Sequence, residues 1–222
     1  MRAVLLDIEG TVCPIHFVSS QLFPWVLDHV DQWLRAHPAD AAVLQIAEQI
    51  AEQRVDGELA DHVRALIRRE MSTGRKYAPL KELQGKMWHE GYVRGELRAP
   101  VFPDVKSAFH LWNAAGVRIA IYSSGSELAQ RDFFRYSVEG DLARYIHSYF
   151  DTRYGAKREA ASYQHIAAAL QVAPEDVVFV SDVRAELDAA RAAGMRTVLA
   201  VRPGNPPQNA MSLRSIGSFD EI

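Results

Sequence analysis

The stretch Ala3-Val-Leu-Leu-Asp-Ile-Glu-Gly-Thr11 decides the fold and points to the chemistry. Its apolar part, residues 3–8, is short and continuous, which is typical of a strand buried on both faces of a sheet. Asp7 interrupts that apolar run. A carboxylate in such surroundings is costly unless it is paired or bound to a metal. The alternative interpretation of Asp7 is a capping or turn aspartate.

From Pro103 onward, apolar runs of β type alternate with helical patterns. The runs cover residues 117–122, a short stretch ending at Phe150-Asp151, 177–180 and 197–201. Helices are predicted over 104–115 with Asp104 as the N-cap, 126–136, 157–170 and a stretch that ends at Gly194. Such alternation indicates βαβ units, so we expect an α/β fold with a parallel sheet.

A different pattern occupies residues 20–98, where apolar residues recur at helical spacing and no strand signal intervenes. Pro100 and Pro103 then break the helical pattern and form a natural hinge. We therefore predict a core formed by residues 1–15 and 101–222. An insert of four or five helices, residues 16–100, separates its two parts.

Composition excludes several classes of function. The chain has 222 residues and a net charge of −3, so it lacks the basic excess that binding to nucleic acid requires. No segment approaches the roughly 20 apolar residues that span a bilayer, and the amino-terminal apolar run is too short for a signal peptide. Cys13 is the single cysteine, which suits a reducing compartment, and we expect it to be a packing residue. We expect a soluble, cytoplasmic monomer, because no coiled coil or long apolar edge stands out.

Polar residues follow three of the predicted strands at the point where each strand ends. They are Asp7 with Glu9, Ser123 with Ser124, and Asp182. Ligands bind outside the carboxyl ends of parallel strands, so these groups should face one crevice. Several of these residues also have an ordinary structural interpretation: Asp182 as a helix N-cap, and the two serines as loop residues. Lys157, at the start of the predicted helix 157–170, could likewise be an exposed surface residue. Their occurrence at successive strand ends favours a site.

These residue types indicate phosphoryl transfer. An ionised Asp7 can attack phosphorus and form an acyl phosphate. Several carboxylates without a cluster of Cys or His favour an oxygen-liganded ion, and Mg²⁺ fits best. Lys157 and the Ser123 hydroxyl would offset charge on the phosphoryl oxygens. Glu9 lies two residues beyond Asp7, on the same side of the strand end, where it could protonate the leaving oxygen.

The order Asp7-Ile-Glu9-Gly-Thr11, Ser123, Lys157 and Asp182 resembles the four-motif signature of the haloacid dehalogenase-like superfamily. Within it, the chain resembles the enolase-phosphatases of methionine salvage, also called acireductone synthases. Shared segments include Leu83-Gln-Gly-x-Met87-Trp88, Ile121-Tyr-Ser-Ser-Gly-Ser126 and Val201-Arg-Pro-Gly-Asn205. The resemblance implies a Rossmann-like core with a helical cap inserted after the first strand. It also implies Mg²⁺-dependent enolisation of 2,3-diketo-5-methylthiopentyl 1-phosphate, followed by dephosphorylation to acireductone.

The resemblance also assigns roles at the matching positions. It implies that Asp7 is the nucleophile and a metal ligand, and that Asp182 is another ligand. Glu9 would be the acid/base and would offer its backbone carbonyl to the metal; most phosphatases of the superfamily carry Asp at its position. Ser123 and Ser124 would bind the phosphoryl group, and Lys157 would steady it. Glu9 is also our first choice for the enolisation base, and Gln84 or Lys86 of the cap would contact the keto groups.

Three other functions fit part of the pattern. A phosphatase for a different small phosphate ester keeps every role above. A dehalogenase would use Asp7 on carbon, but it would need neither Glu9 nor a metal at Asp182. A non-catalytic phosphate-binding protein would be expected to lack one of the nucleophile, the lysine or the metal carboxylate, and all of them are present.

Overall fold

Strand β1 (Ala3–Leu6) lies in the middle of a six-stranded parallel sheet with the order β3-β2-β1-β4-β5-β6. The other strands are β2 (Arg118–Tyr122), β3 (Ile146–Phe150), β4 (Val177–Ser181), β5 (Arg196–Ala200) and β6 (Ser215–Ile216). The structure is a computed structural model that describes residues 1–52, 57–73, 77–207 and 213–222. It confirms the predicted α/β fold with a parallel sheet. The sequence pattern did not predict β6, which has only two residues.

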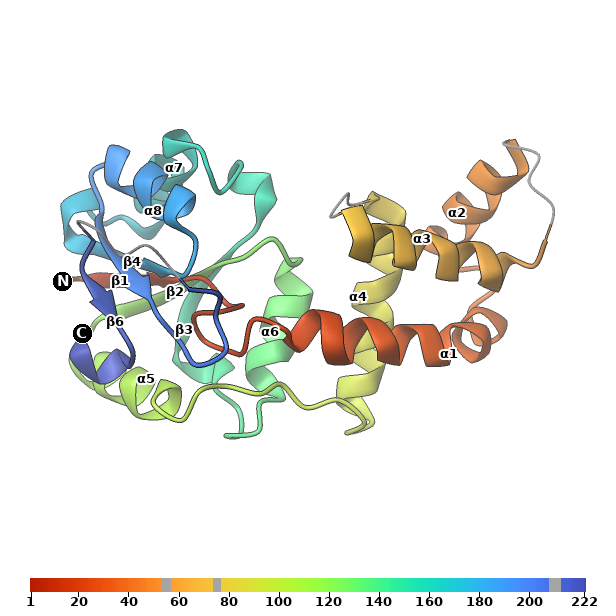
Figure 1. The fold of residues 1–222 in the computed structure, drawn as a ribbon, viewed down its shortest axis with the longest axis horizontal. Coiled ribbons are helices and arrows are strands. Elements are labelled where there is room, and N and C mark those ends of the chain that lie inside the picture. The colour runs from red at the N-terminus through yellow and green to blue at the C-terminus, as the bar shows by residue number, and fades with distance from the viewer. Residues whose placement is uncertain (53–56, 74–76, 208–212) are drawn as a thin grey trace. The chain divides into compact units, whose positions relative to one another are not determined.

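Helices cover both faces of this sheet. They are α5 (Val105–Ala114), α6 (Glu127–Arg135), α7 (Ala160–Leu170) and α8 (Arg184–Ala192), with 3₁₀ turns at Ala143–Tyr145, Thr152–Tyr154, Pro174–Asp176 and Phe219–Glu221. Figure 1 shows α7 and α8 on one side of the sheet and α5 on the other. Ala3 and Leu5 share a buried cluster with residues of α7 and α8, so Val4 and Leu6 point to the opposite face. All four residues of β1 are fully buried, as expected of a strand covered on both faces.

The register of the central strands brings three strand ends to one level. Leu6 of β1 pairs with Ile121 of β2 on one side and with Val180 of β4 on the other. Asp7 therefore leaves the sheet beside the ends of both neighbouring strands. Ser123 and Asp182 each follow the last residue of their own strand, so the predicted polar residues do gather at the carboxyl edge.

By its contacts the chain divides into two compact units, Met1–Phe17 with Arg98–Ile222 and Val18–Leu97. The second unit is helical. It begins with a π-helical turn, Val18–Leu22, and continues with α1 (Phe23–Ala36), α2 (Ala41–Glu52), α3 (Leu59–Thr73) and α4 (Ala78–Val93). Apolar faces of these helices share one buried core, which includes Val30, Ile46, Ile67 and Leu83.

Two polar residues of α4 have partners inside this helical unit. Gln84 is buried, and its Nε2 donates to Glu70 Oε2 at 3.1 Å. The Nζ of Lys86 lies 2.7 Å from carboxylate oxygens of both Asp40 and Glu82. These contacts stabilise the packing of α4 against α3 and the start of α2, which is a structural role for both side chains.

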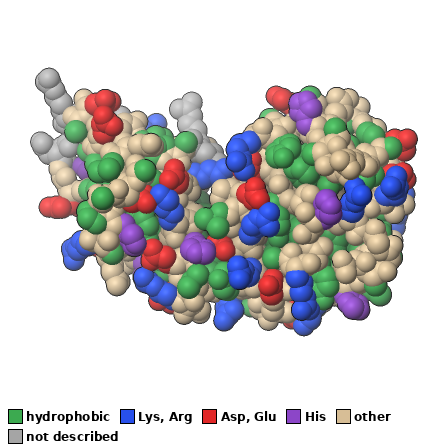
Figure 2. All heavy atoms as spheres, turned by 180° about the vertical axis from the view of Figure 1, so that it is seen from behind, with side chains coloured by type: hydrophobic (Ala, Val, Ile, Leu, Met, Phe, Trp, Pro, Cys, Tyr) green, Lys and Arg blue, Asp and Glu red, His purple; other side chains and the backbone are tan. Residues whose placement is uncertain are grey.

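The described part of the chain contains no helix that is long and apolar enough to cross a membrane. On the face shown in Figure 2, Lys and Arg side chains are interspersed with Asp and Glu. This mixture agrees with the small net charge of −3.

Asp104 ties the carboxyl-terminal segment to the helical layer, and its side chain makes no cap hydrogen bond to α5. Asp104 does stand at the N-cap position of α5, as predicted, but the expected capping by its side chain is wrong. Its Oδ2 instead lies 2.8 Å from the guanidinium of Arg202 and accepts from the backbone N of Phe219 at 2.6 Å. Arg202 is also stacked on the ring of Phe219, with 4.3 Å between the guanidinium carbon and the ring centroid. A buried cation with these partners outweighs a local cap.

We predict that Asp104→Ala lowers the free energy of unfolding by about 3 kcal/mol, because it leaves the buried Arg202 without its counter-ion. Urea unfolding followed by circular dichroism measures the change. Glu139→Ala is the matched control, because it breaks an exposed ion pair between Glu139 and Lys106, and Lys106 lies in the first turn of α5. That variant should lose less than about 1 kcal/mol. Equal losses in the two variants would contradict the role given to Asp104.

Candidate active site

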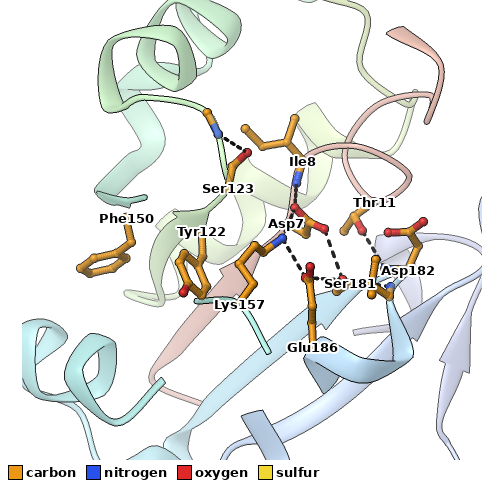
Figure 3. Close-up of polar contacts among 12 residues, drawn as sticks. Asp7, Ile8, Thr11, Tyr122, Ser123, Phe150, Lys157, Ser181, Asp182 and Glu186 are labelled. Carbon is orange, nitrogen blue, oxygen red and sulfur yellow. Dashed lines mark hydrogen bonds and ion pairs between the residues drawn. The ribbon is translucent and has the colours of Figure 1, made fainter. Parts of the chain in front are cut away.

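Lys157 lies at the centre of the charged groups beyond the strand ends. Its Nζ is 2.7 Å from Asp7 Oδ1 and 2.7 Å from Glu186 Oε2 (Figure 3). Burial lowers the pKa of Lys157, but the charges of Asp7 and Glu186 outweigh that effect and raise it above its ordinary value. The ammonium therefore stays charged in a buried position, which is the fixed positive charge that a phosphoryl group needs.

Lys157 belongs to the loop before α7. The prediction that a helix begins at this residue is wrong, because α7 begins at Ala160. Glu159 has extended backbone angles, with φ −115° and ψ 128°, so the helix cannot extend back past it. The lysine therefore reaches the site from irregular backbone.

Ser181, the last residue of β4, connects the two carboxylates that contact Lys157. Its hydroxyl lies 3.2 Å from Asp7 Oδ2 and 3.1 Å from Glu186 Oε2, and it accepts from the backbone N of Val183. Burial and the charge of Asp7 raise the pKa of Glu186 to about 7, while Lys157 acts in the opposite direction. Glu186 is therefore held by one cation and one hydroxyl in a place where a carboxylate is otherwise unfavourable.

Asp182 follows Ser181 and packs against the loop that carries the proposed nucleophile. Its backbone N donates to Thr11 Oγ1 at 3.1 Å. Gly10 has a φ of +69°, and a Cβ on it would lie 2.4 Å from Asp182 Oδ2. Only glycine fits here, because both the conformation and the space exclude a side chain. Burial, followed by the charge of Asp7, raises the pKa of Asp182 to about 6.

Two side chains from the segment after β5 hold the same loop from its other side. Asn205 Nδ2 donates to the carbonyl of Gly10 at 2.8 Å, and Arg202 Nε donates to the carbonyl of Thr11 at 2.9 Å. The loop after β1 is therefore fixed by donors from a segment almost two hundred positions away in the chain. Its conformation, and with it the place of Gly10 against Asp182, depends on that segment.

Ser123 begins the loop after β2, and Gln130 of α6 supports this loop. The backbone N of Ser123 donates to the carbonyl of Phe150, and its Oγ accepts from the backbone N of Gly125 at 3.3 Å. Gln130 is buried, and its Nε2 donates to the carbonyls of both Gly125 and Phe150 at 2.9 Å. Figure 3 shows Ser123 on the same side of the sheet edge as Asp7. Ser124 follows it and is partly buried.

Glu9 and Cys13 lie in the loop after β1, where Glu9 is partly buried and forms a backbone bridge to Cys13. The thiol of Cys13 is fully buried. Burial, and then the charges of Glu9, Asp7 and Asp182, raise its pKa well above the ordinary value. A thiol in this state is a poor nucleophile, and Cys13 packs as predicted.

The donor set fits a divalent cation held by few protein ligands. Asp7 and Glu186 contact the same cation, Lys157, whereas among the described residues no basic side chain pairs with Asp182. In the same part of the chain, no three Asp, Glu, His or Cys side chains converge as a complete metal site. Mg²⁺ requires no such cage, because one or two carboxylates, waters and a substrate phosphate satisfy it.

Comparisons with known proteins agree with this geometry. The model of the haloacid dehalogenase-like hydrolases matches residues 1–194. Enolase-phosphatase E1 of Synechococcus elongatus is 46% identical over 100% of this chain and 98% of its own length. Enolase-phosphatase E1 of Drosophila virilis is 44% identical over 93% of this chain and 87% of its own. The chain belongs to the enolase-phosphatase E1 family of haloacid dehalogenase-like hydrolases.

A solved structure is similar over the same length. The UTR4 protein of Saccharomyces cerevisiae is similar with a TM-score of 0.81 and 35% identity, covering 100% of this chain and 99% of its own. The family resemblance recognised in the motifs is thereby confirmed. Enzymes of this family depend on a metal ion, in agreement with the excess of negative charge around Asp182.

Sequence reasoning missed Glu186, although a signal for it exists. Asp182 is predicted as a polar residue at a strand end, and Glu186 stands four positions later in the first turn of α8. An acidic residue there is ordinarily explained by the helix dipole. What reveals its role is its burial at 8% exposure and its contact with Lys157, neither of which the sequence displays.

We predict that Mg²⁺ stabilises the protein through Asp182, and more at pH 7.5 than at pH 5. The pKa of about 6 in the folded state exceeds the roughly 3.9 of an unfolded aspartate, so the folded metal-free protein binds the extra proton. Its stability from this group falls as pH rises from about 4 to 7, and a cation compensates for that loss. Melting temperatures with EDTA and with Mg²⁺ at both pH values measure the effect.

The control for this measurement is Asp188→Asn, which changes an exposed acid on the same helix, α8. It should keep the wild-type response to Mg²⁺, whereas Asp182→Asn should lose most of it. An unchanged response in Asp182→Asn would rule out this residue as a ligand.

Proposed function

We propose that this protein is the enolase-phosphatase of methionine salvage. It enolises 2,3-diketo-5-methylthiopentyl 1-phosphate and then hydrolyses the phosphate ester to give acireductone. The single observation that carries the proposal is the Asp7–Lys157–Glu186 contact beside Asp182, in a chain related over its full length to enolase-phosphatases E1. We further propose a monomer that acts in the cytoplasm on this small phosphate ester.

In the phosphatase stage, the carboxylate of Asp7 attacks phosphorus as the bond to the substrate oxygen breaks. Glu9 gives its proton to that leaving oxygen. Water then attacks the phosphorus of the aspartyl phosphate, Glu9 takes the proton of that water, and inorganic phosphate leaves. Asp7 is regenerated as a carboxylate, so atoms and charges balance over the cycle.

The neighbouring groups hold the phosphoryl group in place. Lys157 has a buried ammonium beside Asp7, where it can bind one phosphoryl oxygen. Ser123 and Ser124 offer hydroxyls from the loop after β2, which Gln130 supports. Asp7, the backbone carbonyl of Glu9 and Asp182 would hold Mg²⁺. When bound, Mg²⁺ supplies positive charge to the phosphoryl oxygens.

The enolisation stage needs a base beside the carbon next to a carbonyl group. We assign this role to Glu9, because it stands two residues beyond Asp7 and its carboxylate has no other function before phosphoryl transfer begins. As Glu9 takes the proton from carbon, the carbonyl oxygen takes up a proton from solvent, so the enol forms and Glu9 enters the phosphatase stage protonated. After the aspartyl phosphate is hydrolysed, Glu9 returns the proton taken from water to solvent and is again a carboxylate. One residue can therefore act in both stages.

The first test follows phosphate release from the diketo phosphate with and without Mg²⁺, while ultraviolet absorbance reports the enol. We expect metal-dependent release with a transient enol signal. Release without an enol would remove the enolase stage. Release from a generic phosphate ester alone would leave a phosphatase with a different substrate, and release of halide from a haloacid would indicate a dehalogenase.

The second test is Asp7→Asn, which should reduce kcat by at least about 1000-fold, since an amide cannot attack phosphorus. The melting temperature should remain that of a folded protein. Asp188→Asn, on the surface, should retain full activity. Normal turnover in Asp7→Asn would contradict the covalent mechanism.

A further inference from the structure

Three consecutive carbonyl groups in the loop that carries Lys157 accept hydrogen bonds from three side-chain hydroxyls. Tyr122 Oη donates to Gly155 O at 2.9 Å. Ser162 Oγ donates to Ala156 O at 2.8 Å, and Tyr163 Oη donates to Lys157 O at 2.7 Å. The third of these carbonyls belongs to Lys157 itself. Each carbonyl from Gly155 to Lys157 is therefore held by one hydrogen bond, and the lysine side chain extends from this fixed backbone.

The donors stand on rigid elements. Tyr122 ends β2, while Ser162 and Tyr163 lie in the first turn of α7. Both tyrosines are fully buried, and their rings meet edge to face with 5.5 Å between centroids. Burial raises the pKa of each phenol, so both remain protonated donors. The loop is therefore attached to the sheet on one side and to α7 on the other.

Gly155 shows how tightly the loop is held. Its φ is +126°, which L side chains rarely adopt, and a Cβ on it would lie 2.1 Å from Ser162 Oγ. The backbone thus approaches the serine hydroxyl as closely as glycine permits. This close approach is what places the carbonyl of the next residue within reach of Ser162.

The end of the lysine also lies near one of the donors. Nζ of Lys157 is 5.8 Å from the centroid of the Tyr122 ring. In Figure 3 the stem runs beside that ring toward Asp7 and Glu186. A lysine stem has four rotatable bonds, and holding its ammonium on two carboxylates is entropically costly unless the backbone is fixed.

We propose that Tyr122, Ser162 and Tyr163 are positioning residues that hold the Lys157 loop, so that the lysine ammonium meets the phosphoryl group in one fixed place. The inference rests on the proposed function, in which Lys157 binds a phosphoryl oxygen. It adds to that function a set of groups which touch no substrate and act through Lys157.

The test removes one hydroxyl at a time and leaves the ring packing intact. Tyr163→Phe and Tyr122→Phe should each lower kcat for the diketo phosphate about tenfold, the size of effect expected from losing a group that supports a site residue. Isothermal titration calorimetry with inorganic phosphate and Mg²⁺ should show a similar loss of affinity. Tyr149→Phe is the matched control, because its hydroxyl is buried and has no hydrogen-bond partner among the described residues. It should change neither quantity more than about twofold.

A double-mutant cycle separates positioning from a general loss of structure. In a Lys157→Met background phosphate binding is already weakened, so adding Tyr163→Phe should cause no further loss. The same factor of loss in both backgrounds would overturn the inference, as would tyrosine variants that bind phosphate like wild type. If wild type fails to hydrolyse the diketo phosphate, the proposed function fails, while the phosphate titration still decides this inference.

Discussion

The ammonium of Lys157 is the group on which the rest of the site depends. Asp7 and Glu186 lie on either side of it at 2.7 Å, in a place where water is largely excluded. Burial and the charge of Asp7 raise the pKa of Glu186 to about 7, and the buried cation between the two carboxylates acts against that rise. Lys157 therefore holds Asp7, the proposed nucleophile, beside a second acid that contacts the same cation.

This arrangement explains why so much of the surrounding structure restrains backbone. The loop after β1 is held by Asn205 and Arg202, and the loop after β2 by Gln130. Each of these side chains donates to a main-chain carbonyl. Irregular loops lack the hydrogen-bond ladder that fixes a strand, so side-chain donors take its place. The parallel sheet brings the loops together, and these donors decide their final shapes.

The sequence predicts the role of a residue well where the partners of that residue lie close to it in the chain. The continuous apolar runs and the polar residues after them predicted the sheet, its carboxyl edge and the gathering of Asp7, Ser123 and Asp182 there. Glu186 was not predicted, because an acid in the first turn of a helix has a sufficient local explanation. Asp104 was misinterpreted for the same reason, since an aspartate before a helix resembles a cap until Arg202 is seen beside it. Both errors concern residues whose partners lie far away in the sequence.

The position of the helical unit in the chain has a consequence for how the protein is made. Ala3 of β1 pairs with Arg118 of β2 and with Val177 of β4, so the ribosome completes Val18–Leu97 before either neighbour of β1 exists. The helices can form their mostly local contacts early, whereas β1 must wait for most of the chain. During that interval an apolar strand stands unpaired in the nascent polypeptide. The carboxylate that ends this strand lowers its tendency to associate with other chains, which is a benefit of Asp7 quite separate from its chemistry.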